Sequence, residues 1–354
     1  MKLSVQEYIK KIPYYPKAAM YGSEDGWVRL SSNENPYPPS PEAISRMMDE
    51  LFCVNRYPGN ESELKDAISK HYGKEPENVL IGNGSNEIIE LSLKAMKHGT
   101  KNKVVISEPS FAFYEIASKI YGYETVKAPL VKMKVDLGVV RDCIDDHTRV
   151  VFLNNPNNPT GTIFNGEKFT DFLKNLPTDV LVVVDEAYGE FVESRAFPDS
   201  FSCINDYPVI ILRTFSKAYG LAGLRIGYGV GEKSVISFLD RTKQPFSVNV
   251  MAISAAKAAL MDQKYLKKVL NNNRKGKKFL YKALKALSVE FIPTEANYIL
   301  VKIGSTAESV TKRLYEEKIL VRWMGSYNLD EYIRVGIGTM DENIVFVEVL
   351  KRIL

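Results

Sequence analysis

A lysine with a serine on one side and an arginine eight positions further on lies between two apolar runs of this sequence. The runs 209–212 and 226–230 are short enough for buried strands, and Ser216, Lys217 and Arg225 fall between them. Ligands of α/β proteins bind where strands end. A lysine with apolar neighbours there has a lowered pKa and attacks carbonyl groups. The serine and the arginine suit a phosphate, so the stretch points to pyridoxal phosphate (PLP), which carries an aldehyde and a phosphate.

The alternative is that these are solvated side chains at the edges of loops, as most lysines are. A second feature favours the cofactor. Asp185 directly follows the uninterrupted apolar run 180–184, where a carboxylate is costly unless it has a cationic partner. A protonated pyridine nitrogen is such a partner. Tyr188, three residues later, could reach the phenolic oxygen of the same ring. Asp185 could instead be a helix N-cap.

Three further positions fit the same ligand, although each has a plainer interpretation. Asn158 follows the predicted strand 149–154 and could donate to the phenolic oxygen, or belong to an ordinary turn. Ser85 and Asn86 open a predicted helix, whose backbone N–H groups suit a phosphate. Phe111 could stack on the cofactor ring or belong to the core.

Composition narrows the remaining possibilities. The formal net charge of +4, with both signs interspersed, argues against a nucleic-acid-binding arm. Cysteines and histidines show no metal-ligand spacing, so we expect no metal site. No apolar run approaches the length of a membrane span, and the first residues lack a signal-peptide core, which favours a cytoplasmic protein.

The order of predicted elements indicates an α/β fold with two domains and an N-terminal arm. Residues 1–30 show no strong period. Residues 31–245 contain apolar strands that alternate with helices, which indicates a large domain with a mostly parallel sheet between helices. Residues 246–354 begin with two helices and continue with short alternating strands, which indicates a smaller α+β domain.

With these residues assembled, the chain resembles the histidinol-phosphate aminotransferase family of fold-type I, class II PLP enzymes. The resemblance covers nearly the whole chain, and the matching motifs occur in the order of the family. They are Asn33-Glu34-Asn35-Pro36, Arg56-Tyr57-Pro58, Gly84-Ser85-Asn86-Glu87, Asn158-Pro159-Thr160-Gly161, Asp185-Glu186-Ala187-Tyr188, Ser216-Lys217 with Arg225, Gln244-Pro245-Phe246 with Asn249, Ala296-Asn297-Tyr298 and Ile333-Arg334-Val335.

The resemblance implies a role for each cofactor residue. Lys217 would hold PLP covalently and later move the substrate proton, while Asp185 would pair with the ring nitrogen. The phenolic oxygen would be held by Asn158 and Tyr188. The remaining cofactor contacts would come from Ser85, Asn86, Ser216 and Arg225 at the phosphate and from Phe111 at the ring face.

The same resemblance implies a homodimer with composite active sites, in which Tyr57 reaches the PLP phosphate of the partner subunit. Arg334 would grip the substrate α-carboxylate with a two-pronged ion pair. Arg322 and Tyr14 would recognise the phosphate of histidinol phosphate, and Asn33 would add a substrate contact. Two positions depart from the family pattern: Phe111 stands where many members have Tyr, and Trp323 is unexpectedly large.

The expected reaction is exchange of an amino group between L-histidinol phosphate and 2-oxoglutarate, which gives imidazole acetol phosphate and L-glutamate, in histidine biosynthesis. Small molecules, an amino donor and a 2-oxo acid, are therefore the expected partners. Two other reactions on the same scaffold stay open. They are transamination of aromatic amino acids and decarboxylation of threonine phosphate.

Overall fold

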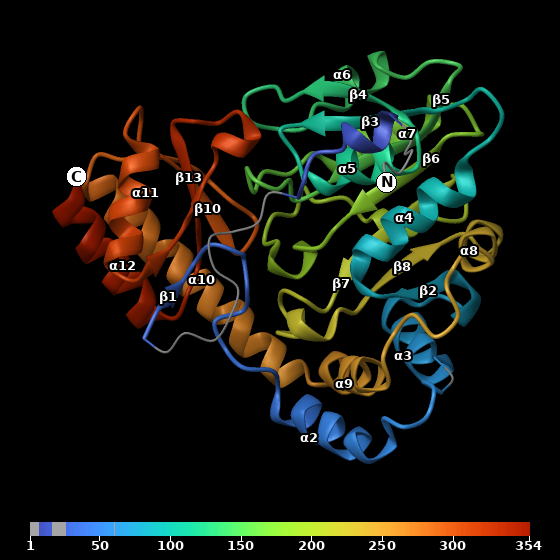
Figure 1. Ribbon diagram of the computed structural model, residues 1–354, viewed down its shortest axis with the longest axis horizontal. Helices are drawn as coiled ribbons and strands as arrows, with labels where there is room; N and C mark the ends of the chain where they lie inside the picture. Colours follow the sequence, from blue (N-terminus) through green and yellow to red (C-terminus); the bar gives the residue numbers. More distant parts are fainter. Residues whose placement is uncertain (1–6, 16–25, 60) are drawn as a thin grey trace, which may run out of the picture.

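Two units with separate sheets lie side by side in the computed structural model, which describes residues 7–15, 26–59 and 61–354 (Figure 1). The larger unit is built on a seven-stranded sheet and the smaller on a four-stranded one. The predicted N-terminal arm, residues 1–30, falls partly outside the described residues. Within them, no helix is long and apolar enough to cross a membrane.

The large sheet has the strand order β2-β8-β7-β6-β5-β3-β4, and only β8 runs against the others. The predicted mostly parallel sheet is therefore confirmed. Because the parallel strands point the same way, their carboxyl ends share one edge of the sheet, where ligands of such folds bind. The bounds are β2 Val79–Gly82, β3 Lys103–Glu108, β4 Glu124–Pro129, β5 Thr148–Asn154, β6 Leu181–Asp185, β7 Val209–Thr214 and β8 Gly227–Gly231.

Both faces of this sheet are covered, because the apolar residues of its central strands point alternately to two separate cores. Val182 and Val184 of β6 point into one core, while Leu181 and Val183 point into another. The second core is closed by α4 (Gly84–Met96), α5 (Phe113–Ile120) and α8 (Lys233–Asp240). The first core is closed by α2 (Pro41–Glu50), α3 (Ser62–Tyr72), α6 (Leu137–Asp142), α7 (Gly166–Lys174) and α9 (Val250–Met261).

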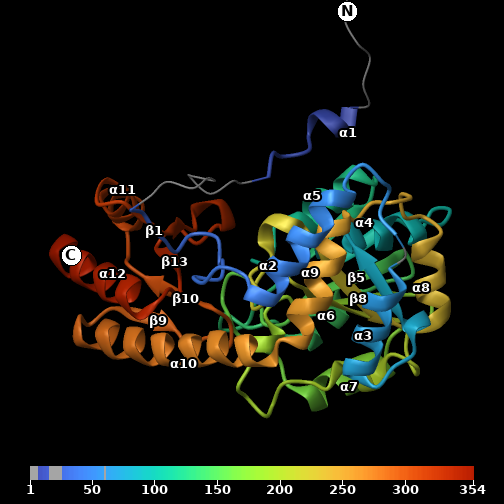
Figure 2. The same cartoon turned by 90° about the horizontal axis from the view of Figure 1, so that it is seen from below.

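The small unit is an antiparallel sheet of order β12-β13-β10-β9 packed against three helices. Its helix α10 is long, and Figure 2 shows it running from α9 along the small unit. The bounds are β9 Glu290–Ile292, β10 Tyr298–Lys302, β12 Arg322–Trp323, β13 Tyr332–Gly336, α10 Gln263–Ala286, α11 Ala307–Glu316 and α12 Met340–Ile353.

The chain that leads into the large unit also belongs to the small one. Strand β1 (Val28–Arg29) pairs in parallel with β11 (Ile319–Leu320), and the backbone N–H of Gly336 donates to the carbonyl of Leu30 at 2.7 Å. Residues 31–35 therefore leave the small unit and cross directly to the edge of the large sheet.

Helices α9 and α10 link the two units, and the elements not yet described are short. Helix α9 contributes alanines to the large core and lies against α2, and the next helix, α10, reaches the small core. The domain limits at 31–245 and 246–354 stay a prediction. The short elements are α1 Glu7–Lys10, η1 Leu51–Cys53, η2 Pro76–Asn78, η3 Gly189–Phe191, η4 Ser200–Cys203, η5 Ala222–Leu224 and η6 Gly325–Tyr327.

Candidate active site

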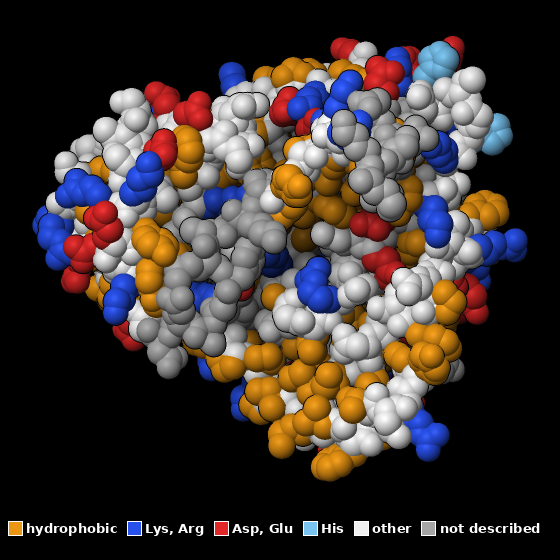
Figure 3. All heavy atoms as spheres, in the orientation of Figure 1, with side chains coloured by type: hydrophobic (Ala, Val, Ile, Leu, Met, Phe, Trp, Pro, Cys, Tyr) orange, Lys and Arg blue, Asp and Glu red, His pale blue; other side chains and the backbone are white. Residues whose placement is uncertain are grey.

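A pocket opens at the carboxyl edge of the large sheet, facing the small unit. Figure 3 shows the molecule hollowed between the two units, with Lys and Arg side chains in the hollow. The lining comes from the ends of β5, β6 and β7, the start of α4, the segment after β1, and strands β12 and β13. It includes most of the predicted site residues: Asn33, Ser85, Asn86, Phe111, Asn158, Asp185, Tyr188, Ser216, Lys217, Arg225, Arg322 and Arg334.

Lys217 lines this pocket, three residues beyond the end of β7. Its Nζ donates to the carbonyl of Ser32 at 3.0 Å and lies 5.8 Å from the ring centroid of Tyr188. Desolvation, followed by the positive charges of Arg334 and Arg225, lowers the pKa of Lys217 to about 8. A substantial fraction of this amine is therefore neutral near physiological pH, as a nucleophile requires.

Asp185 ends β6 and is almost completely buried. Its Oδ2 accepts a hydrogen bond from the hydroxyl of Tyr114 at 2.7 Å, and its Oδ1 accepts one from the N–H of Ala187 at 3.1 Å. Burial raises the pKa of Asp185, while the hydrogen bonds and the charge of Lys217 oppose that rise. A buried carboxylate at the base of a pocket is suited to a cationic ring nitrogen.

An amide and a phenol flank the lysine. Asn158 Oδ1 accepts a 2.6 Å hydrogen bond from Nη1 of Arg334, which leaves the amide nitrogen as the end that can donate into the pocket. Asn33 Nδ2 donates to the hydroxyl of Tyr188 at 2.9 Å. Burial raises the pKa of Tyr188 to about 12, so this hydroxyl stays protonated and can also donate.

The opposite end of the pocket is suited to an anion. Ser85 and Asn86 occupy the first turn of α4, where the backbone N–H groups have no hydrogen-bond partner within the helix. Arg225 takes a left-handed conformation with φ of 55°, and its Nη1 approaches Oγ of Ser216 at 3.4 Å. Gly84 has a φ of 72°, which favours glycine, and a Cβ there would lie 2.6 Å from Nη2 of this arginine and displace the guanidinium.

Two arginines enter the pocket from the small unit. Arg322 of β12 and Arg334 of β13 are register partners on adjacent antiparallel strands, so their side chains lie on the same face. Arg334 is buried, and its Nη2 donates to the carbonyl of Ser31 at 2.8 Å. The guanidinium of Arg322 lies 5.5 Å from the ring centroid of Tyr327.

Two predicted site residues do not line the pocket. Tyr14 is fully exposed, and its neighbour Tyr15 lines the pocket instead, 6.3 Å from the ring of Phe111. Tyr57 is 80% exposed and stacks on Phe246 with centroids 4.7 Å apart. A residue that serves the partner subunit must point outward, so the position of Tyr57 is compatible with its predicted role. Both roles stay predictions.

Sequence reasoning missed several residues of the site. No sequence pattern predicts the contact of Tyr114 with Asp185, because a tyrosine in an amphipathic helix ordinarily belongs to the core. Asn154 could have been found as the last residue of a predicted strand. It donates to the carbonyl of Asp185 at 2.9 Å and accepts from the N–H of Asn158 at 2.7 Å. Glu34, which directly follows Asn33, lines the pocket as a second carboxylate.

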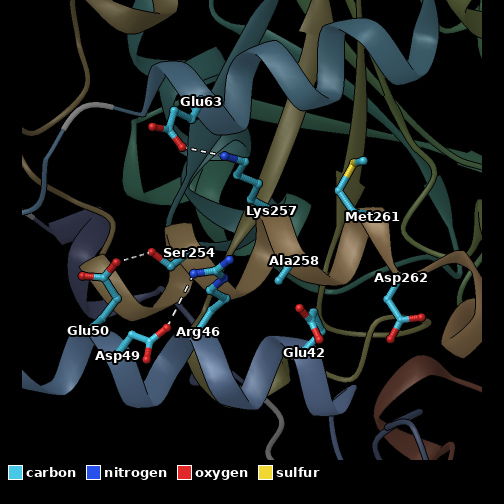
Figure 4. Close-up of a pocket in the computed structure, with 10 residues that line it drawn as sticks. All are labelled: Glu42, Arg46, Asp49, Glu50, Glu63, Ser254, Lys257, Ala258, Met261 and Asp262. Carbon is cyan, nitrogen blue, oxygen red and sulfur yellow. Dashed lines mark hydrogen bonds and ion pairs between the residues drawn. The ribbon is translucent and has the colours of Figure 1, made fainter.

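A different hollow between α2, α3 and α9 carries no comparable chemistry (Figure 4). The charges that line it pair largely with each other. Lys257 contacts Glu63 at 2.5 Å, the hydroxyl of Ser254 donates to Glu50 at 2.5 Å, and Arg46 lies 3.6 Å from Asp49.

The residues of the active-site pocket fit PLP. Buried polar atoms on its wall, Nε of Arg334 and Oδ1 of Asn33, have no hydrogen-bond partner among the described residues, as expected where a polar ligand completes a site. The family model named aminotransferase class I and II matches residues 25–350. The chain belongs to this aminotransferase family.

Relatives of this aminotransferase cover almost its full length. It is 39% identical over 355 residues to a histidinol-phosphate aminotransferase of Moorella thermoacetica, with 99% of this chain and 92% of that protein covered. It is 41% identical to histidinol-phosphate aminotransferase 2 of Pseudomonas fluorescens, with 92% and 89% covered. The crystal structure of the Sinorhizobium meliloti histidinol-phosphate aminotransferase in complex with pyridoxal-5'-phosphate superposes with a TM-score of 0.88 at 26% identity, covering 99% of this chain and 98% of that one. The expected family, fold and cofactor are thereby confirmed.

Proposed function

We propose that this aminotransferase exchanges an amino group between L-histidinol phosphate and 2-oxoglutarate in histidine biosynthesis, with imidazole acetol phosphate and L-glutamate as products. The observation that carries the proposal is that one pocket is lined by Lys217, by Asp185 and by the pair Arg322 and Arg334. The full-length relatives named as histidinol-phosphate aminotransferases support the substrate.

PLP, when bound, supplies an aldehyde for the amino group and an electron-poor ring that stabilises negative charge at the substrate Cα. Lys217 binds the cofactor and then moves the proton at Cα, for which its lowered pKa is suited. Asp185 would keep the ring nitrogen protonated. The amide of Asn158 and the hydroxyl of Tyr188 would hold the phenolic oxygen.

The cofactor phosphate is held at the far end of the pocket. The first turn of α4, with Ser85 and Asn86, supplies N–H groups and the positive end of the helix. Arg225 and Ser216 add a charge and a hydroxyl from the loop after β7. Phe111, at the wall of the pocket, would cover the ring face without the hydroxyl that a tyrosine would bring.

Substrate anions are bound by the small unit. The fork of Arg334 matches the α-carboxylate of glutamate, and the neighbouring Arg322 adds the second charge that a phosphate needs. Asn33 orients Tyr188 and borders the same space. Tyr14 lies outside the pocket, and its contact with the substrate phosphate remains part of the proposal.

We also propose a cytoplasmic homodimer with shared active sites. Exposed apolar side chains gather on α2 and the segment after it, including Met48, Phe52, Val54 and Tyr57, and Figure 3 shows hydrophobic side chains gathered over α2 and α9. A patch of this kind is typical of a protein interface. Tyr57 would reach the PLP phosphate of the partner subunit from this surface.

A coupled assay tests the substrate assignment. The purified protein is supplied with 2-oxoglutarate and, in turn, with histidinol phosphate, phenylalanine, tyrosine and threonine phosphate. We expect glutamate formation to be fastest with histidinol phosphate. Preferred turnover of an aromatic amino acid, or release of carbon dioxide from threonine phosphate, would replace the proposal by one of the two alternative reactions.

A further inference from the structure

Tyr114 of α5 lies behind the pocket wall and is completely buried. Its hydroxyl donates to Oδ2 of Asp185 at 2.7 Å, which makes it a side-chain partner of that carboxylate. The other oxygen, Oδ1, accepts from the backbone N–H of Ala187. Each carboxylate oxygen thus receives one hydrogen bond from the protein, which leaves further lone pairs for a ligand.

Two aromatic contacts hold the ring of Tyr114 in place. It stacks on Phe152 of β5 with centroids 4.9 Å apart and an interplanar angle of 3°. Its other contact is an edge-on approach to Phe111, with centroids 5.4 Å apart and an angle of 89°. One side chain therefore supports both Asp185 and the aromatic ring expected to cover the cofactor.

The hydroxyl of Tyr114 stabilises the charged form of Asp185. Burial favours the neutral acid, whereas a hydrogen bond to the carboxylate favours the anion. The other titratable groups that face this region are Lys217, whose charge also favours the anion, and the tyrosines Tyr188 and Tyr298. Without the phenolic donor, a proton shared between Asp185 and a ring nitrogen shifts towards the carboxylate.

We propose that Tyr114 is a positioning residue that keeps Asp185 ionised, and thereby keeps the ring nitrogen of PLP protonated, while its ring holds Phe111 in place. The inference rests on the proposed pairing of Asp185 with PLP. It does not depend on which amino donor the enzyme uses.

The decisive variant is Tyr114→Phe, which keeps the ring contacts with Phe152 and Phe111 and removes only the donor. The matched control is Tyr123→Phe. Tyr123 is also buried in the same core, and its hydroxyl donates to the carbonyl of Leu93 at 2.8 Å, away from the pocket. Both variants lose one buried hydrogen bond, so a purely structural effect should be similar in the two.

Each protein is loaded with PLP labelled with ¹⁵N in the ring, and the ¹⁵N chemical shift and the dissociation constant of PLP are measured. In Tyr114→Phe we expect the shift to move towards that of the unprotonated ring and PLP affinity to fall roughly tenfold or more. The kcat of the glutamate half-reaction should fall with little change in KM, because glutamate is bound by the arginines. Tyr123→Phe should match the wild type in all of these values.

Unchanged ring protonation and PLP affinity in Tyr114→Phe, with a loss of thermal stability equal to that of Tyr123→Phe, would reduce Tyr114 to a core residue. Equal losses of PLP affinity in Tyr114→Phe and Tyr123→Phe would assign the effect to the general loss of a buried hydrogen bond and overturn the role of the donor. Asp185→Asn is the reference for a lost pairing. If Asp185→Asn leaves the ¹⁵N shift unchanged, the pairing itself fails, whereas a wrong choice of substrate leaves all of these readouts intact.

Discussion

Arg334 and Asn158 are joined by a 2.6 Å hydrogen bond from Nη1 of the guanidinium to Oδ1 of the amide. The bond connects strand β13 of the small unit to the loop after β5 of the large one. It fixes the orientation of the Asn158 amide, so that the residue proposed to hold the cofactor is oriented by the residue proposed to hold the substrate. We therefore expect substrate binding at Arg334 and cofactor geometry at Asn158 to be coupled.

The two arginines should differ in which half-reaction they serve. Arg334→Ala should damage the reactions of both glutamate and histidinol phosphate, because it removes the anion fork and the support of Asn158. Arg322→Ala should weaken the histidinol phosphate reaction more, by about 2–4 kcal/mol in transition-state stabilisation if a charge-assisted pair is lost. Single-turnover rates with each substrate measure this difference. Equal losses of rate with the two substrates in Arg322→Ala, or a loss confined to glutamate, would show that Arg322 does not bind the substrate phosphate.

Lys217 should carry the cofactor, and its attachment should depend on pH. Borohydride reduction followed by peptide mapping should place the pyridoxyl group on Lys217, and Lys217→Ala should abolish transamination with the fold intact. Because the pKa of Lys217 is lowered to about 8, the attachment rate of PLP to the apo protein should rise as pH increases through about 8 and then level off. Stopped-flow absorbance follows this rate. A label on another lysine contradicts the assignment.

Shared active sites should allow two inactive proteins to rescue each other. Lys217→Ala and Tyr57→Ala subunits, when mixed and allowed to exchange, should form hybrid dimers in which one of the two sites is wholly native. Activity should therefore reappear on mixing. Sedimentation analysis provides the independent check, and a monomer at assay concentration would rule out the shared site.

The buried ion pairs of Arg213 with Glu186 and Glu190 should contribute strongly to the free energy of unfolding. Arg213 lies 2.7 Å from Glu186 and 3.1 Å from Glu190, all three largely buried. Arg213→Met leaves two uncompensated carboxylates and should cost about 3–5 kcal/mol in the free energy of unfolding.

This loss should depend on pH. Burial raises the pKa of both Glu186 and Glu190 in the folded state, so ionising either glutamate destabilises the folded protein as pH rises above the ordinary pKa of a glutamate. The loss in Arg213→Met should thus be larger at pH 8 than at pH 5, as measured by urea unfolding. Lys101→Met, which breaks an exposed ion pair with Asp179, is the control and should cost little.

The sequence predicted the centre of the large sheet well, because its strands are apolar on both faces. The predicted strands at 149–154, 180–184 and 209–212 match β5, β6 and β7 to within a residue or two. Strand β4 was missed because it lies at the sheet edge with a half-exposed pattern and no apolar run. The reversed direction of β8 was also not predicted, since a buried strand has the same composition in either direction.

The site was predictable where chemistry restricts the residue type, and less so where packing decides. A lysine, an aspartate and arginines that gather at strand ends are costly to bury, so their combination indicates a charged ligand. Tyr114 and Tyr15, in contrast, reach the site through the packing of α5 and through the course of the N-terminal segment. Neither arrangement leaves a local pattern in the sequence. The pairing of β1 with β11 has the same character, because it joins two short segments that are far apart in the chain.

That pairing sets the order in which the enzyme can be completed during synthesis. Val28 and Arg29 leave the ribosome long before their partners Ile319 and Leu320, which follow every strand of the large sheet. The segment that carries Ser32 and Asn33 to Lys217 and Tyr188 can therefore be anchored only after that sheet has been made. A nascent chain that already has its large sheet should still lack a finished pocket, and release of the polypeptide before β11 should leave no partly active fragment.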